Sequence, residues 1–195
     1  MVASITEAVN LALSTLGEPG LTDVAVDTGT TAKECRRWLD VVRQRELMAF
    51  DWPFTIVRTS IVKDAVDPAF GWVSRYAIPA DCLRFLPVTD NGEEFGNPVG
   101  HENEGGFILV DKVADLRLRY VKDEGDVTKW SANFVEVFIA SLAVTLAENL
   151  TGLSQALSTA SSRYEQALSR GHRYEMRQQG TPVSAYSSAW VGERT

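Results

Sequence analysis

Residues 116–121 read Leu-Arg-Leu-Arg-Tyr-Val, and apolar side chains alternate with arginines over the first five positions. This alternation is the period of a β-strand with one face in a core. Short stretches rich in β-branched and aromatic residues also occur at 55–62, 72–78 and 107–110, and they predict further strands. Turn-forming residues separate these stretches, at 64–68, 90–92 and 104–106. The region 55–130 is therefore predicted to be a small antiparallel β subdomain.

The chain before this region begins with a helical period. Apolar residues recur every three or four positions over 5–16, which predicts an amphipathic helix of about three turns. Ser4 is its predicted N-cap, because a serine side chain accepts a hydrogen bond from a free N–H of the first turn. Gly17 is its predicted left-handed C-cap.

A second helix is predicted to begin at the capping-box pair Thr31 and Glu34 and to run to about Phe50. Pro53 ends it, because a proline pushes the preceding residue into an extended conformation. The faces of this helix away from its apolar stripe carry four arginines: Arg36, Arg37, Arg43 and Arg45. Two interpretations of them stay open, a solvated face and a face that binds a partner.

Residues 131–177 are predicted to form a second helical hairpin. Their most apolar run, 134–146, is interrupted by Glu136 and is shorter than the roughly 20 residues that span a bilayer. It predicts a buried central helix and no membrane partner. The last helix carries several cations near its end, which either complement the helix dipole or dock a partner. Gly171 is expected to weaken that end.

The predicted fold class is α+β, mainly α. A bundle of about four helices holds a small antiparallel β-sheet, inserted between two helical hairpins, and an extended C-terminal tail follows. The tail has isolated aromatic residues among small polar ones, so it is either free or becomes ordered on a partner. The predicted segments are the N-terminal hairpin, the acidic β subdomain, the C-terminal hairpin and the tail, at 1–54, 55–130, 131–177 and 178–195.

The sequence contains no recognisable catalytic motif. Neither His101 nor His172 has a second ligand-type residue at i, i+4 spacing, and Cys35 and Cys82 form no paired-cysteine motif. A nucleophile elbow and a phosphate-binding glycine loop are also missing. The sequence therefore predicts a protein that is not an enzyme and that uses no metal or cofactor.

The charge of the chain argues against a protein whose main affinity is for nucleic acid. Its 195 residues have a formal net charge of −7, whereas neutralising phosphates requires a basic surface. The segment 81–126 has eleven acidic and five basic residues, so it carries −6 of that charge. This segment is either a solvated acidic surface or the wall of a channel that repels DNA phosphates. No secretory signal is visible at the N-terminus, which predicts synthesis in the cytoplasm.

Three motifs resemble one family. They are 13–19 (Leu-Ser-Thr-Leu-Gly-Glu-Pro), 50–54 (Phe-Asp-Trp-Pro-Phe) and 76–84 (Tyr-Ala-Ile-Pro-Ala-Asp-Cys-Leu-Arg). Together with the order of helix pair, sheet, helix pair and tail, they resemble the head-to-tail adaptor (connector) proteins of phages. The similarity is to the tail tubular protein A type of short-tailed phages and to related adaptors of other tailed phages and gene transfer agents. It covers most of 4–177.

The resemblance implies a structural virion protein at the head–tail junction, made in the host cytoplasm. Such adaptors form a ring, usually twelvefold, that binds the portal protein and provides the surface on which the tail or tail nozzle assembles. The implied partners are thus the portal, the tail or nozzle protein, further copies of the chain, and DNA that passes transiently through the channel. The alternatives are another phage tail-completion or assembly factor and, further off, an enzyme or a DNA-binding regulator that uses the second helix for recognition.

Two sets of residues are expected to make these contacts. The end of the last helix and the tail are predicted to dock on the portal, through Arg170, Arg173, Tyr174, Arg177, Tyr186 and Trp190. The acidic loops of the β subdomain are predicted to face the lumen or the tail, through Glu93, Glu94, Glu102 and Glu104.

Overall fold

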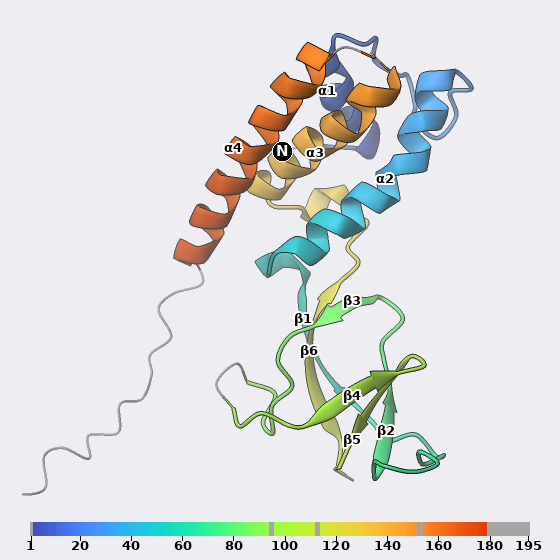
Figure 1. Ribbon diagram of the computed structural model, residues 1–195, viewed down its shortest axis with the longest axis vertical. Coiled ribbons are helices and arrows are strands. Elements are labelled where there is room, and N and C mark those ends of the chain that lie inside the picture. Colours follow the sequence, from blue (N-terminus) through green and yellow to red (C-terminus); the bar gives the residue numbers. More distant parts are fainter. Residues whose placement is uncertain (1, 94–95, 112–113, 151, 153, 179–195) are drawn as a thin grey trace, which may run out of the picture.

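Four helices form one end of the molecule, and six short strands form the other (Figure 1). The computed structural model describes residues 2–93, 96–111, 114–150, 152 and 154–178. Helices α2 and α4 lie on opposite sides of the bundle, with α3 between them, and the strands lie beyond the C-terminal end of α2 (Figure 1). The helices are α1 (Ile5–Leu16), α2 (Thr30–Ala49), α3 (Ala132–Leu150) and α4 (Ser154–Gln178).

The predicted caps of α1 are confirmed, but the predicted start of α2 is wrong. The Ser4 hydroxyl accepts a hydrogen bond from the Glu7 N–H, and Gly17 has a left-handed φ of 76°. Helix α2 begins at Thr30 with Gly29 as its N-cap, and no side chain caps it. Thr31 already lies inside the helix, so its side chain does not take the capping role.

Helix α3 is the central element of the bundle. Its buried side chains lie on several faces, which explains why the segment lacks a polar stripe. Among the described residues it is the one helix long and apolar enough to cross a membrane, and here it packs into the core between the other helices. Its largest buried side chains are Phe134, Phe138, Leu142 and Leu146.

Gly171 does not weaken the end of α4, because the helix continues to Gln178. The glycine instead permits a close approach between elements. A Cβ atom at Gly171 would lie 3.3 Å from Cη2 of Trp52 and 3.5 Å from Cγ2 of Val137. Any larger side chain would therefore push α4 away from α3 and from the segment after α2.

The β subdomain has a core of its own between two three-stranded antiparallel sheets. The sheet orders are β1-β6-β3 and β2-β5-β4. The alternating segment at 116–121 is the central strand β6, and its Leu118 and Tyr120 are buried in this second core with Tyr76 and Ile108. The strands are β1 (Ile56–Ile61), β2 (Ser74–Ala77), β3 (Cys82–Phe85), β4 (His101–Glu104), β5 (Phe107–Val110) and β6 (Leu116–Lys122).

The predicted α+β class is thus confirmed, with an antiparallel sheet in two groups between two helical hairpins. Strands β3 and β4 were not among the predicted ones. Two short 3-10 helices connect the bundle to the β subdomain: Pro53–Thr55 before its first strand and Val127–Lys129 after its last.

Candidate functional site

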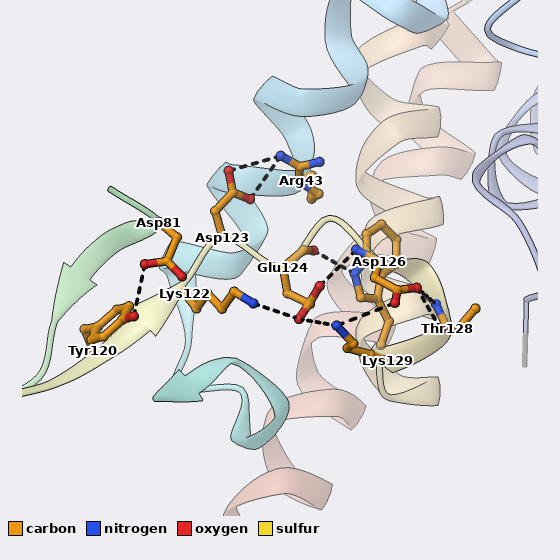
Figure 2. A network of polar contacts seen from close by, with 10 residues as sticks. Arg43, Asp81, Tyr120, Lys122, Asp123, Glu124, Asp126, Thr128 and Lys129 are labelled. Atoms are coloured by element: carbon orange, nitrogen blue, oxygen red, sulfur yellow. Dashed lines mark hydrogen bonds and ion pairs between the residues drawn. The ribbon is translucent and has the colours of Figure 1, made fainter. Parts of the chain in front are cut away.

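A network of polar contacts joins the β subdomain to the helices (Figure 2). Nη2 of Arg43, on α2, lies 3.0 Å from Oδ1 and 3.1 Å from Oδ2 of Asp123, just after β6. The Gln44 amide also donates to Oδ2 of Asp123, at 2.8 Å. Both charged side chains are mostly buried, with exposed fractions of 15% and 23%. The contact therefore fixes the exit of the β subdomain against α2.

The same network continues along the connection to α3 (Figure 2). Oε2 of Glu124 lies 3.5 Å from Nζ of Lys122 and 3.4 Å from Nζ of Lys129. The indole N–H of Trp130 donates to the Glu124 carbonyl at 2.9 Å, and this tryptophan is buried in the bundle core. Glu124 thus positions the first aromatic side chain of the second helical half.

A third acidic residue of the segment 81–126 is also used structurally. The Tyr120 hydroxyl donates to Oδ1 of Asp81 at 3.0 Å. Burial, together with this carboxylate, raises the pKa of Tyr120 to about 12, so the phenol stays protonated. Asp81, Asp123 and Glu124 are therefore structural partners, and the charge of −6 overstates the acidic surface that remains for a channel or a partner.

The motif at 76–84 reaches back to the end of α2. Nε of Arg84, on β3, donates to the Met48 carbonyl at 2.9 Å, and its Nη2 pairs with Asp51. Within the same motif the N–H of Cys82 donates to the Pro79 carbonyl at 2.9 Å and forms the turn before β3. The motif thus marks the junction between the sheet and the helical bundle.

Most arginines of α2 make contacts that stabilise the fold, and these contacts were not among the two interpretations of a solvated face or a partner-binding face. Arg36 donates to the carbonyl groups of Val24 and Asp27, at 2.5 and 2.8 Å, and thereby fixes the loop before the helix. Arg43 holds the junction described above. Arg37 is the most exposed of those whose ion pairs are described, with an exposed fraction of 67%, and it pairs with Glu34 within the helix.

Arg45 lies at the solvent-exposed edge of a polar cluster whose carboxylate, Glu46, is buried between the helices. Its Nε lies 3.1 Å from Oε1 of Glu46, a carboxylate that is only 1% exposed. The hydroxyl groups of Ser141 on α3 and Tyr164 on α4 donate to the same carboxylate, at 2.6 and 3.0 Å. Burial and the Glu46 charge raise the pKa of Tyr164 to about 12, which keeps it a donor. Glu46 therefore links three helices.

His172, on α4, lies near this cluster and against aromatic side chains. Its ring stacks on Phe50, with 4.3 Å between the ring centroids. Its Nε2 atom is buried, and no partner for it is found among the described residues. Burial lowers the pKa of His172 below its ordinary value, although the nearby Glu46 carboxylate acts in the opposite direction.

We expect the neutral form of His172 to make stability depend on pH. The unfolded chain binds a proton at the ordinary histidine pKa of about 6.5, before the folded chain does. The contribution of neutral His172 to the free energy of unfolding is thus fully present above that pH, and it is lost as the pH falls through the lower pKa of the folded state. Urea unfolding of the wild type and the His172→Phe variant between neutral and mildly acidic pH should show a steeper loss for the wild type. Equal losses would contradict the expectation.

The predicted portal-docking residues of α4 share one exposed face. They lie at i, i+3, i+4 and i+7, so their side chains leave the helix on the same side: Arg170, Arg173, Tyr174 and Arg177. Arg170 is 62% exposed and pairs at its edge with Glu136, and Tyr174 is 53% exposed. On the inner face, Glu175 is buried and accepts a hydrogen bond from Asn133 at 3.2 Å. Tyr186 and Trp190 lie outside the described residues.

The predicted acidic residues occupy two different places. Glu93 precedes β4 and pairs with Arg58 on β1, at 3.1 Å. Glu102 and Glu104 lie on β4, an edge strand whose four residues are all exposed. Glu94 lies outside the described residues. Of this set, the structure brings together Glu102 and Glu104, which alternate onto one face of the strand.

An exposed apolar loop next to β4 was not singled out from the sequence. The segment 62–73 joins β1 to β2 and carries four exposed apolar side chains, with exposed fractions of 49% to 89%: Val62, Val66, Phe70 and Val73. The sequence pattern predicts only the ends of two strands and a turn in this segment. Their exposure depends on how the loop lies on the sheet, which the sequence pattern does not determine.

Reactive groups are few in the described part of the chain. No cluster of three or more His, Cys, Asp or Glu side chains there could hold a metal ion. Burial raises the pKa of Cys35 and of Cys82 to about 11, so both are thiols at neutral pH rather than thiolates. The exposed polar and charged side chains on α4 and β4 are suited to binding a partner rather than to catalysis.

No protein-family model matches the chain, and neither does any curated protein.

Proposed function

We propose that this protein is a head-to-tail adaptor of a tailed phage. It forms a ring of about twelve copies on the portal, as closed rotational symmetry allows, and presents the attachment surface for the tail or tail nozzle. DNA passes through the channel of this ring. The protein is made in the host cytoplasm and resides in the virion at the portal vertex.

The meeting of two motifs in space carries the proposal. The motifs at 50–54 and 76–84 both belong to the adaptor pattern and are well separated in the sequence. Arg84 joins them through its ion pair with Asp51, and its hydrogen bond to the Met48 carbonyl extends the contact to the end of α2. This contact supports the interpretation that the two motifs have an architectural role and define how the β subdomain leaves the bundle.

The two sides of the helical bundle support assembly into a ring. A closed ring uses two different faces of each subunit, one against each neighbour. Helix α2 exposes Val41 and Met48, 50% and 43% exposed, on one side of the bundle. Leu11, 46% exposed, lines a groove formed by α1, α3 and α4. Helix α4 lies across the bundle from α2 (Figure 1). These apolar surfaces suit contacts between copies.

The exposed face of α4 supports portal binding. Arginine and tyrosine are the residue types enriched at energetically important interface positions. Arg170, Arg173, Tyr174 and Arg177 present both types on a rigid helix whose inner side is fixed by Glu175 and Gly171. In this proposal the face directs the tail of the chain, with Tyr186 and Trp190, toward the portal.

Truncation after Gln179 is expected to weaken binding to the portal protein of the same phage by about tenfold or more. This is the usual effect of removing several side chains that contribute strongly to an interface. The full-length Arg37→Ala variant is the matched control, because that arginine lies on α2 and pairs with Glu34 of the same helix. Affinity can be measured by surface plasmon resonance with immobilised portal rings. Undiminished binding of the truncated chain would contradict the role of the tail.

Negative-stain electron microscopy of the full chain mixed with its portal tests the function itself. A ring of subunits on the portal is the expected result. Assembly on isolated tails without any portal would assign the chain to tail completion and overturn the proposal.

A further inference from the structure

The outer face of the sheet β2-β5-β4 is hollowed where the loop 62–73 lies beside it. The hollow has a volume of about 620 Å³, and its lining includes the side chains of Phe107 and Leu109 on β5. Phe70 and Trp72 of the loop line it as well. Phe70 is 89% exposed, which is far more than a phenylalanine usually retains in a folded protein. The hollow thus combines apolar and charged side chains, and one of its aromatic rings is left in water.

The strand register explains how this lining is assembled. Glu102 pairs with Leu109, and Glu104 pairs with Phe107, across the antiparallel β4 and β5. Paired residues of neighbouring strands project to the same face of a sheet, so the two glutamates stand beside the two apolar side chains. The indole N–H of Trp72 donates to Oε2 of Glu102 at 2.9 Å, which holds the loop against this edge.

The cations near the hollow are already engaged. Nη2 of Arg75 lies 3.2 Å from Oδ1 of Asp64, and its guanidinium lies 4.5 Å from the centroid of the Phe107 ring. Lys63 pairs with Asp67 at 2.7 Å. Among the described residues, no cation forms an ion pair with Glu102 or Glu104. The rim therefore presents two carboxylates that no described cation neutralises, next to aromatic rings.

Charge on an edge strand can also serve to prevent pairing with other strands. That role accounts for Glu102 and Glu104 but not for the exposed Phe70 or for the apolar lining beside them. Exposed apolar patches with a polar rim are typical of protein-binding sites. A channel wall past which DNA slides has no use for a phenylalanine in water, so the surface favours a protein as its ligand.

We propose that this hollow binds a segment of a partner protein that presents an arginine or lysine beside an apolar side chain. The cation lies between the two carboxylates and beside the Trp72 ring, because the Arg75 guanidinium already lies over Phe107, and the apolar side chain contacts Phe70. Nucleic acid is excluded as the ligand by the charge of the rim. The inference rests on this surface alone and goes beyond the proposed function, because it holds whether or not the chain binds a portal.

Short peptides test the proposal on the intact chain. The probes are Ac-Phe-Arg-Phe-amide and the matched Ac-Phe-Gln-Phe-amide, titrated into the isotope-labelled full chain and followed by NMR. The arginine peptide is expected to shift the amide signals of Phe107, Leu109 and Glu104 and the indole signal of Trp72. It should bind at least about fivefold more tightly than the glutamine peptide, the scale of a charge-assisted contact at a partly exposed site.

Variants locate the site. The double variant Glu102→Gln, Glu104→Gln should abolish the preference for arginine, and Phe70→Ser should weaken both peptides without loss of fold. Glu93→Gln is the matched control, because that carboxylate pairs with Arg58 on the other sheet, and it should leave both affinities unchanged. Equal affinities of the two peptides for the wild type, or no shifts at millimolar peptide, would overturn the proposal. Concentration-dependent shifts of the same signals without peptide would assign the surface to a second copy and also overturn it.

Discussion

Replacing Trp52 with alanine should lower the free energy of unfolding by about 3–5 kcal/mol, the usual cost of deleting a buried tryptophan side chain. Trp52 is fully buried where the end of α2 meets α3 and α4. Its ring contacts those of Phe134 and His172, with centroids 5.2 and 5.9 Å apart, and its N–H donates to the Glu46 carbonyl at 2.9 Å. The close approach at Gly171 leaves nothing on α4 that could fill the space.

Urea unfolding followed by circular dichroism measures this loss, and thermal unfolding should show a midpoint lower by on the order of 10 °C. Trp52→Phe should cost clearly less, since it keeps most of the aromatic contacts. Phe70→Ala is the matched control, because Phe70 is the most exposed large apolar residue described and should change stability by less than about 0.5 kcal/mol. A loss for Trp52→Ala as small as that of the control would show that the three-helix contact contributes little.

Replacing Arg45 with methionine should lower the free energy of unfolding by about 2–3 kcal/mol. Removing one partner of a fully buried ion pair costs about 3–5 kcal/mol, because the other charge is left uncompensated. The cost is lower here because Arg45 is 51% exposed, although Glu46 is 1% exposed. Ser141 and Tyr164 still donate to the Glu46 carboxylate in the variant, but neither supplies a positive charge.

The double variant Arg45→Met, Glu46→Gln distinguishes this cause from lost packing. It removes the uncompensated charge, so it should recover more than half of the loss seen for Arg45→Met by urea unfolding at neutral pH. Arg37→Met is the matched control on the same helix, where an exposed pair contributes less than about 1 kcal/mol. If the double variant recovers no stability, the loss comes from the packing of the aliphatic part of the Arg45 side chain and not from its charge.

The sequence pattern predicted the helices well because local signals determine them. Ser4 and Gly17 cap α1 through contacts within one turn. The apolar run of α3 is stable in water only when its side chains are buried in a core. The alternating strand β6 was predicted for the same reason. At Thr31 the local signal failed, because Gly29 can occupy an N-cap as well, and the tertiary contacts of the loop before α2 decide which residue does so.

The missed features depend on contacts between distant residues. Strand β4, His-Glu-Asn-Glu, has no apolar side chain, and only its pairing with β5 makes it a strand. The acidic residues Asp123 and Glu124 seemed to be free charges, because their partners are found on α2 and in the connection to α3. The face formed by Arg170, Arg173, Tyr174 and Arg177 was accessible to sequence reasoning, since helical spacing alone places these residues together.

The β subdomain enters and leaves the bundle through neighbouring strands. Its first strand, β1, and its last, β6, pair along their whole length, with Ile56 opposite Val121 at the end nearest the helices. Residues paired in this way have Cα atoms about 5 Å apart, so a short turn could replace everything between them. The subdomain has its own core, and the four helices have another. Evolution could therefore lengthen, exchange or delete the whole module, and with it the partner specificity at its far end, while the helical scaffold stays the same.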